Sequence, residues 1–478
     1  MKRIILTFTF INFLIINLLA QYPIMDYVYA EVDFSKKLHV WDGFGFNYVE
    51  TSQTFDYDSD PQDYGGFSIL DQADREKVID MVFGENGLKV GLLKMFYDPF
   101  HQEKPDGNFN HERTTQYLRM FARDGYRKTI GRGGNLQIIT TLYGPPAWAT
   151  LQKVIRGRDI DPAQKENLAN YLVSWAKFLK EKENLPVKYV SIHNEGEDLW
   201  RWPIDGKDPN IGKGHDYNMF WPPQLIAEFL PLLKTQLLKS GLNDVGVTPG
   251  ETSNWSRFHY WGYAPVIAGD TRALEAMDLI TSHGFGDHSS VGIDLLREKK
   301  PGLHAWATST SWGQMDARNI RDMHVIIYTV KANGIIPWAG IQRPPKWVGG
   351  DPNPGNAFTV HEDGTLELRR GYYFYKQISR AGQPGMAVAQ TYVLRSDLAL
   401  IAFSSNDTKN NDAFLIINTG RNPQKLRVDI KGVNHKIYAA FRTNETEEQY
   451  KDIGSFNVIN NILEYEAPVG SVTTFFAR

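Results

Sequence analysis

The sequence predicts an α/β protein, built as a (β/α)8 TIM barrel followed by an antiparallel β-sandwich domain. Three observations lead to this fold class. Short apolar runs alternate with longer amphipathic stretches up to about residue 370. After that point, closely spaced strand patterns follow one another, separated by turn residues. The length of 478 residues accommodates one barrel of about 250 residues or more and a second, smaller domain.

Eight apolar runs are the candidate barrel strands. Their length and β-branched content favour strands over buried helix segments. They are Trp41–Tyr48, Leu88–Phe96, Leu136–Tyr143, Val187–His193, Val245–Thr248, Asp278–His283, Leu303–Thr308 and Ile335–Ile341. Helical patterns lie between them, at Gln72–Met81, Glu112–Arg123, Ala163–Lys182, Pro223–Ser240 and Ala317–Lys331. Successive βα units of this kind predict a barrel over residues 41–370.

Residues 371–478 predict the β-sandwich. Turn clusters such as 404–407 and 419–423 divide short strand patterns. A separate strand pattern, Tyr27–Phe34, lies within residues 21–40, and we expect this segment to join the sandwich. The strands expected after Tyr372 are Ala387–Leu394, Leu398–Ser404, Ala413–Asn418, Lys425–Ile430, Lys436–Arg442, Phe456–Ile459 and Ser471–Phe476.

The first twenty residues predict a secretory signal peptide. Lys2 and Arg3 precede an apolar run from Ile4 to Ala20. Cleavage is expected after Ala20, although Leu18 is not the small residue usual at that position. The alternative is an uncleaved membrane anchor, and no later segment is long and apolar enough to span a bilayer. Export without cysteines indicates a secreted or periplasmic bacterial protein.

The amino-acid composition excludes several classes of function. Lysine and arginine total 52 and acidic residues 55, and this net charge of −3 argues against a nucleic-acid binder. The absence of cysteine excludes a disulfide scaffold, a cysteine nucleophile and thiolate zinc sites. Aromatic residues reach 13%, and the 12 tryptophans suit stacking on sugar rings. We therefore expect a carbohydrate partner, no cofactor and a monomer.

Barrel enzymes carry their catalytic groups at the carboxyl ends of the strands. Asn194 and Glu195 follow strand four, Glu251 follows strand five, and His283 and Asp287 follow strand six. Glu195 is the candidate general acid, because an apolar wall raises the pKa of such a carboxyl and suits it to protonate a leaving oxygen. Asn194 is a candidate donor to a sugar hydroxyl.

Four sequence motifs are informative when taken in order along the chain. They are Trp41-Asp42-Gly43-Phe44-Gly45, Gly144-Pro145-Pro146-Ala147-Trp148, Asn194-Glu195, and Tyr372–Arg380 with Gln383-Pro384-Gly385. Together they resemble clan A glycoside hydrolases, and family 30 in particular, over nearly the whole mature chain. The resemblance implies the barrel and sandwich fold, and retaining hydrolysis of a β-linked glycoside with Glu195 as acid/base.

One part departs from the family. Its nucleophile is a glutamate at the end of strand seven, where this chain has Ser309. A serine hydroxyl is not ionised near neutrality and cannot balance an oxocarbenium-like charge. Three explanations stay open: hydrolysis with inversion, using a base elsewhere on the rim; a carbohydrate-binding protein that has lost hydrolysis; or an engineered replacement. Glu251 is the first candidate for the base and Asp287 the second, with Glu197 and Asp198 behind them.

The remaining rim residues are candidates for substrate binding. The set is Tyr143, Trp148, His283, Asn194, Asp287, Ser309, Trp312, Trp338 and Arg343. For the tryptophans the alternative is core packing. Asp287 and His288 resemble half of a metal site, but no second pair has matching spacing, so no metal is expected. A lyase would need a metal or a phosphate-binding loop, for which Gly349-Gly350 is too weak a match.

Basic residues in the loops after strands four and eight indicate an acidic substrate. Arginine binds carboxylates and sulfates through two parallel hydrogen bonds, which fits a uronic-acid or sulfated glycan. The alternative is an ordinary solvated surface. The residues are Arg201, Lys207, Lys213, His215, Arg343 and Lys346.

Overall fold

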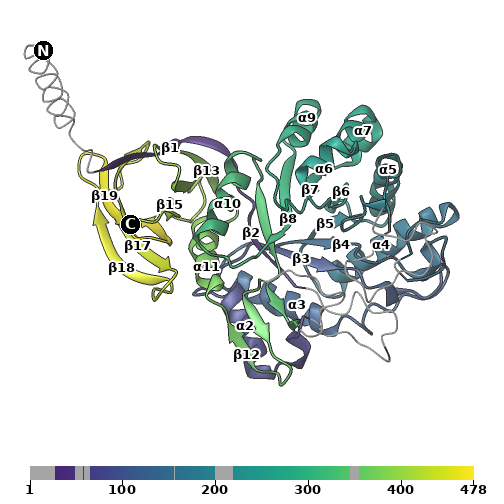
Figure 1. The fold of residues 1–478 in the computed structure, drawn as a ribbon. Coiled ribbons are helices and arrows are strands. Elements are labelled where there is room, and N and C mark those ends of the chain that lie inside the picture. Colours follow the sequence, from purple (N-terminus) through teal and green to yellow (C-terminus); the bar gives the residue numbers. More distant parts are fainter. Residues whose placement is uncertain (1–26, 49–57, 59–64, 156, 200–218, 345–354) are drawn as a thin grey trace, which may run out of the picture.

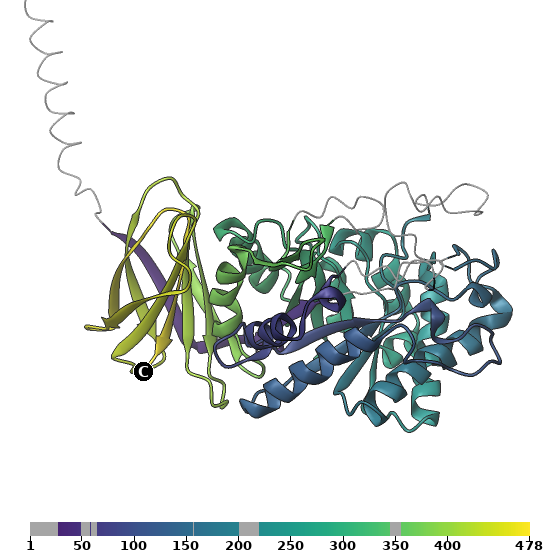
Figure 2. The same cartoon turned by 90° about the horizontal axis from the view of Figure 1, so that it is seen from below.

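The computed structural model describes residues 27–48, 58, 65–155, 157–199, 219–344 and 355–478. The expected signal peptide at 1–20 lies outside these residues, as do Arg201, Lys207, Lys213, His215 and Lys346. Within them, no helix is long and apolar enough to cross a bilayer. Figures 1 and 2 show two parts side by side, a barrel-like α/β part and a β-sheet part, with helices α10 and α11 between them.

The α/β part is built on eight parallel strands in the order β6-β5-β4-β3-β2-β9-β8-β7. Isolated parallel bridges, Val247 with Met277 and Thr252 with Ser282, link the chain around the two edge strands. This arrangement is consistent with the predicted (β/α)8 barrel, and each predicted strand is present. The bounds are β2 Gly43–Asn47, β3 Leu92–Phe96, β4 Gln137–Thr141, β5 Val187–Ser191, β6 Gly246–Thr248, β7 Leu279–Ser282, β8 His304–Ser311 and β9 Gly334–Trp338.

The helices cover the outside of this sheet (Figure 1). Helix α4 shows why: Leu168, Leu172, Trp175 and Leu179 recur at helical spacing and are all buried. The bounds are α2 Gln72–Phe83, α3 Gln116–Gly131, α4 Lys165–Glu181, α5 Pro223–Lys239, α6 Trp255–Tyr260, α7 Tyr263–Gly269, α8 Thr271–Ala276, α9 Val291–Lys299, α10 Ala317–Tyr328 and α11 Gly371–Ala381, with short 3-10 turns at Phe67–Ile69, Pro99–His101, Ala147–Ala149 and Pro162–Gln164.

Local hydrogen bonds decide where helices begin. Asp71 accepts the amide of Asp74 at 2.8 Å and starts α2 where the sequence predicted it. Helix α3 begins at Gln116, four residues later than predicted. The reason is Asn110, whose side-chain oxygen accepts the amides of Glu112 and Arg113 and holds them in a turn.

The β-sheet part is one continuous mixed sheet of nine strands, in the order β18-β17-β20-β15-β14-β13-β1-β16-β19. Two separate sheets are not seen, so the predicted sandwich is not confirmed. Its apolar face buries residues such as Val32, Phe414, Tyr438 and Phe475. The bounds are β1 Val28–Val40, β13 Ala387–Val393, β14 Leu398–Ser404, β15 Ala413–Asn418, β16 Gln424–Lys431, β17 Ile437–Asn444, β18 Lys451–Asn457, β19 Ile462–Ala467 and β20 Ser471–Ala477; a small three-stranded sheet is formed by β10 Ile341–Gln342, β11 Phe358–Val360 and β12 Leu366–Leu368.

Strand β1 lies inside this sheet. It pairs antiparallel with β13 and parallel with β16. The sequence missed β19, although Leu463, Tyr465 and Ala467 alternate with exposed glutamates as a half-buried strand requires. It also placed the strand at Phe456–Ile459 too late, since β18 ends at Asn457.

Close packing joins the two parts. Helix α11 packs against both, and the Tyr375 hydroxyl donates to the Gly45 carbonyl of β2 at 2.6 Å. Gly45 is also needed inside the barrel, because a Cβ there would lie 2.6 Å from Ile336 of β9 and 2.9 Å from Leu92 of β3. On the other side, Lys409 donates to the Gly133 carbonyl at 2.5 Å. One apolar cluster therefore runs from the barrel through α11 to Phe403 and Leu415 of the nine-stranded sheet, and the sheet has a separate second cluster of its own.

Candidate active site

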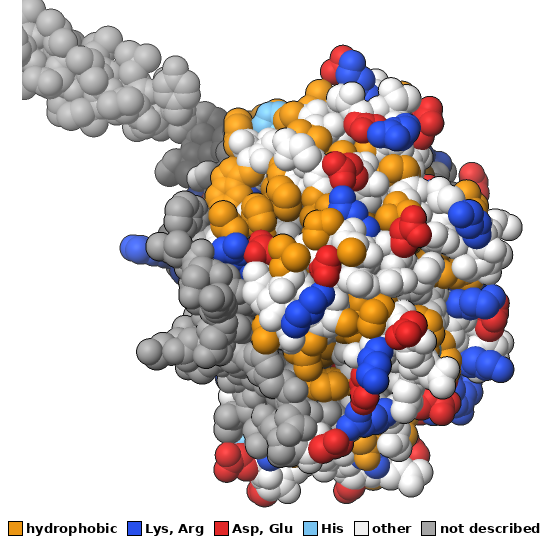
Figure 3. All heavy atoms as spheres, turned by 90° about the vertical axis from the view of Figure 1, so that its right-hand side faces the viewer, with side chains coloured by type: hydrophobic (Ala, Val, Ile, Leu, Met, Phe, Trp, Pro, Cys, Tyr) orange, Lys and Arg blue, Asp and Glu red, His pale blue; other side chains and the backbone are white. Residues whose placement is uncertain are grey.

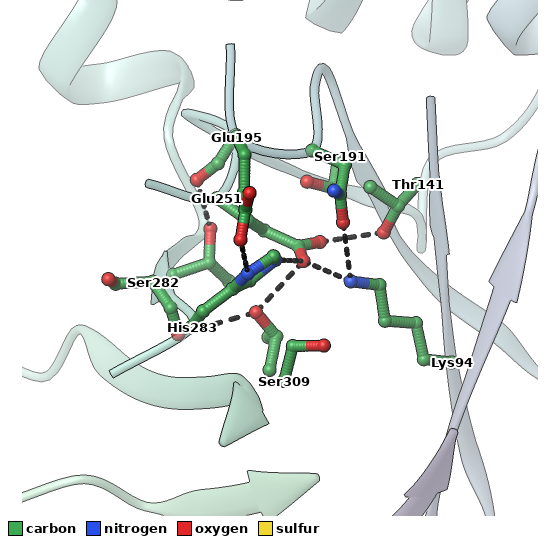
Figure 4. Close-up of polar contacts among 12 residues, drawn as sticks. Lys94, Thr141, Ser191, Glu195, Glu251, Ser282, His283 and Ser309 are labelled. Atoms are coloured by element: carbon green, nitrogen blue, oxygen red, sulfur yellow. Dashed lines mark hydrogen bonds and ion pairs between the residues drawn. The ribbon is translucent and has the colours of Figure 1, made fainter. Parts of the chain in front are cut away.

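The polar residues at the carboxyl ends of the barrel strands meet in one network (Figure 4). Glu195 follows β5, Glu251 follows β6 and His283 follows β7. Lys94 lies within β3, Thr141 ends β4, and Thr308 and Ser309 lie in β8. Parallel strands bring their carboxyl ends to the same edge, which is why residues far apart in sequence converge here.

The loops after β5 and β6 continue side by side beyond the strands. The amide of Glu251 donates to the His193 carbonyl at 3.0 Å, and the amide of Glu195 donates to the Glu251 carbonyl at 2.7 Å. Glu195 takes a left-handed backbone with φ of 50°, which is uncommon and strained for a residue other than glycine. These backbone contacts bring the two carboxylates into one site.

Glu251 is enclosed by donors. Its side chain has no exposed surface, and it accepts from Thr141 Oγ1 at 2.6 Å, Thr308 Oγ1 at 2.9 Å and the Lys94 ammonium. His283 Nε2 completes the set at 3.1 Å. Burial alone would raise the pKa of Glu251, but the charge of Lys94 and the hydrogen bond from His283 outweigh it and hold the pKa far below its usual range. Glu251 is thus an ionised carboxylate without access to solvent.

His283 lies between the two carboxylates (Figure 4). Its Nδ1 is 2.8 Å from Glu195 Oε1, while its Nε2 faces Glu251. Burial and the charge of Lys94 lower the pKa of His283, yet the hydrogen bonds to both carboxylates leave it above its usual value. The side chain of Glu195 is 10% exposed, against none for Glu251. Glu195 is therefore the carboxylate of this pair that a ligand can reach.

Lys94 also contacts Asn194. Its ammonium lies 3.2 Å from Asn194 Oδ1, and the side chain is fully buried. Sequence reasoning missed Lys94, Thr141 and Thr308. The signal for Lys94 was present, because a single lysine interrupts the apolar run Leu92-Leu93-Lys94-Met95-Phe96 of a barrel strand. A lysine on a strand buried along its length needs a charged partner.

Ser309 lies beside β2. Its Oγ accepts from Asn47 Nδ2 at 3.2 Å. Asn47 Oδ1 is buried and has no hydrogen-bond partner among the described residues. A small polar molecule such as water would satisfy that oxygen. Ser309 thus forms a polar contact with Asn47 next to the network. It lies in β8, the seventh barrel strand, as predicted from the sequence.

The four predicted aromatic residues lie in three different settings. Tyr143 and Trp338 meet with Phe96 in a small apolar cluster at the strand ends. Trp148 donates its indole N–H to the Gln102 carbonyl at 2.9 Å and is 8% exposed. Trp312 is 1% exposed and packs edge-on against Tyr375. Core packing accounts for Trp312, whose predicted stacking on sugar does not fit this position.

The other carboxylates on the rim are engaged elsewhere. Asp287 accepts the amides of Ser256 and Ser289 and holds its own loop. Glu197 is buried and pairs with Arg257 at 3.2 Å, and Asp198 lies 3.7 Å from the same guanidinium. Arg343 is half-buried and lies just after β10. Within the described ranges no cluster of three or more potential ligands could hold a metal.

Comparisons with known proteins show the fold. No protein-family model matches the chain, and no curated protein matches it by sequence. Solved structures do match. A GH30 endoxylanase from Clostridium papyrosolvens C71 is 16% identical, with a TM-score of 0.69 over 94% of this chain and 99% of that one. The catalytic domain of GH30 xylanase C from Talaromyces cellulolyticus is also 16% identical, with a TM-score of 0.70 over 94% and 100%.

A further match extends the range of named activities. The endo-β1,6-glucanase BT3312 is 16% identical to this chain, with a TM-score of 0.69 over 94% of each. The resemblance to family 30 stated from the sequence therefore holds at the level of the fold. The fold of the chain is similar to that of these GH30 structures.

Proposed function

We propose that the protein is a secreted or periplasmic glycoside hydrolase that cleaves a β-linked glycan, with Glu195 as the general acid. The observation that carries the proposal is the contact of Glu195 with His283 at 2.8 Å, at the carboxyl ends of the barrel strands. A histidine with a shifted pKa that is bonded to a carboxylate in that position is typical of acid–base chemistry. The pattern of residues 2–20 supports export.

The chemistry divides between the two sides of the site. Glu195 protonates the leaving oxygen, and Asn194 donates to a hydroxyl of the sugar. Ser309 and Asn47 hold the attacking water on the strand-seven side, since the carboxylate of a retaining enzyme is absent there. This arrangement favours inversion, because the water attacks the anomeric carbon directly and no carboxylate is placed there to form a covalent intermediate. Glu251 does not contact the water, because its oxygens are filled by donors.

The substrate class is to be decided by measuring hydrolysis of a panel of glycans. The face in Figure 3 mixes Lys and Arg with Asp and Glu, without a field of one sign over the described atoms. Five of the six basic residues on which the prediction of an acidic glycan rests lie outside the described residues. Neutral, uronic and sulfated β-glycans therefore all belong in the panel of substrates.

A second candidate function is carbohydrate binding without hydrolysis. The specific observation behind it is the combination of Ser309 on strand seven with a Glu251 that no solvent reaches. A barrel that had lost its catalytic carboxylate would keep Asn194 and the aromatic cluster of Tyr143 and Trp338 as a sugar site.

An NMR time course of anomeric product tests both candidates. Wild type, Glu195→Gln and Ser309→Glu are compared on the panel. We expect the wild type to release product with inverted anomeric configuration, and Glu195→Gln to lose about 10²–10⁴-fold in rate. If the wild type binds glycans but releases nothing, while Ser309→Glu gains activity, the hydrolase is excluded and the binding protein remains. Retention of configuration in the wild type would contradict the assigned water.

A further inference from the structure

Two charged residues of the site cannot touch a substrate. The side chains of Lys94 and Glu251 have no exposed surface, and they bond to each other beneath Asn194 and His283. A buried ion pair adds little net stability compared with apolar residues of similar volume. The two charges act instead on the side chains that they contact, Asn194 and His283.

Lys94 fixes the orientation of the Asn194 amide. An ammonium is a donor without any acceptor, so the atom of Asn194 that faces it at 3.2 Å has to be the oxygen. The amide nitrogen of Asn194 then points away from Lys94, and its N–H groups are the part offered to a ligand. Without Lys94 the amide is free to rotate by half a turn and present an acceptor instead.

Glu251 fixes the proton on the His283 ring in the same way. An ionised carboxylate only accepts, so His283 Nε2, at 3.1 Å, has to carry a hydrogen. Nδ1 then faces Glu195 Oε1 at 2.8 Å with one proton between them. That proton is on Nδ1 when the pair is imidazolium and carboxylate, and on Oε1 when it is imidazole and carboxylic acid. Both states contain the same number of protons.

We propose that Lys94 and Glu251 are positioning residues that select which atoms Asn194 and His283 present, so that Glu195 and His283 share one transferable proton. This inference rests on the proposed function of Glu195 as the acid. The charged and titratable groups around His283 are Glu195, Glu251, Lys94 and His193. His193 stays neutral near neutrality, because burial lowers its pKa to about 3.

The reaction step balances with this single proton. As the glycosidic bond breaks, its electron pair stays on the leaving oxygen, which takes the shared proton from Glu195. His283 is left neutral with its hydrogen on Nε2. Water adds its oxygen to the anomeric carbon from the strand-seven side and releases its proton to solvent, and the Glu195–His283 pair takes a proton back from solvent once the product has left.

Nitrogen NMR of the full-length protein labelled with ¹⁵N-histidine tests the inference without any substrate. The ring signals of His283 are assigned by comparison with His283→Asn. We expect Nε2 of the wild type to be protonated throughout the neutral range. In the double variant Lys94→Met/Glu251→Gln no ammonium fixes the amide, which donates or accepts equally well, and we expect a mixture of His283 tautomers. Thr308→Val removes one donor to Glu251 and provides a milder variant should the double variant not fold.

A second measurement tests Lys94. Lys94→Met is expected to keep the His283 hydrogen on Nε2, because Glu251 remains, but to raise the Kd for glycans at least tenfold. Lys234→Met is the matched control, since it breaks the ion pair with Asp278 (2.7 Å) just before β7. It should leave glycan binding unchanged.

The outcomes separate the two proposals. A bare Nε2 in wild-type His283, or His283 signals that are unchanged in both the double variant Lys94→Met/Glu251→Gln and Thr308→Val, would overturn the positioning of His283. Unchanged glycan binding in Lys94→Met would overturn the positioning of Asn194. The expected NMR result in a protein that hydrolyses no glycan would instead count against the proposed function alone.

Discussion

Replacing Lys94 with methionine should destabilise the barrel strongly. Methionine keeps most of the volume of lysine but leaves Glu251 without its opposite charge, in a place with no exposed surface. Removing one partner of a buried ion pair costs about 3–5 kcal/mol. With an unfolding entropy of about 2.1 cal/mol/K per residue over residues 41–370, this corresponds to a fall in Tm of about 4–7 °C.

The loss should depend on pH through His283. Lys94 lowers the pKa of His283, so its removal raises that pKa further. A group with a raised folded-state pKa stabilises fully below its unfolded value of about 6.5 and loses that contribution as pH rises through the folded value. The deficit of Lys94→Met is therefore smallest below pH 6 and largest above the pKa of His283.

Urea denaturation followed by circular dichroism, across a series of pH values, measures the effect. Lys94→Met combined with Glu251→Gln removes the stranded charge, and it should recover at least half of the loss. Lys234→Met, whose ion pair is partly exposed, should cost no more than about 1 kcal/mol. The reasoning is refuted if Lys94→Met loses less than about 1 kcal/mol, or if the double variant loses the sum of both single effects.

Three further predictions concern packing and acid stability. Burial lowers the pKa of His111 to about 4, so the unfolded chain binds its proton first and stability falls as pH drops from about 6.5 to 4; His111→Gln should reduce that fall by up to about 3 kcal/mol in denaturation at matched pH values. Gly45→Ala places a Cβ against Ile336 and should cost about 1–3 kcal/mol; a wild-type Tm would show that the strands can move apart. Tyr375→Phe removes the hydrogen bond to the Gly45 carbonyl and should lower the free energy of unfolding by about 1–3 kcal/mol; a calorimetric Tm equal to that of the wild type would contradict this.

Local patterns explain what could be predicted from the sequence. The barrel strands are runs of apolar and β-branched residues buried along their length. Such runs can be recognised in the sequence without knowing which segments pack around them. The strand-end positions of Glu195, Glu251 and His283 followed from those runs. The start of helix α3 was predicted too early, because the side chain of Asn110 holds the preceding residues in a turn. Strand β19 was missed, because its two exposed glutamates make the apolar pattern less evident.

Long-range contacts explain what could not be predicted. The difference between Glu195, which a ligand reaches, and Glu251, which none reaches, depends on Lys94, Thr141 and Thr308. Each of these residues is more than fifty positions away from Glu251. The continuity of the nine-stranded sheet depends in the same way on pairing between the two ends of the chain.

The position of β1 determines when the nine-stranded sheet can assemble during synthesis of the chain. Strands β16 and β19 are joined to the rest of their sheet through β1, which is made first, whereas β13 and β16 are made more than three hundred residues later. The growing chain therefore has to keep β1 unpaired until nearly all of the protein has left the ribosome. A fragment that starts at residue 371 would have a gap in the middle of its sheet, and only an added copy of residues 28–40 would close it.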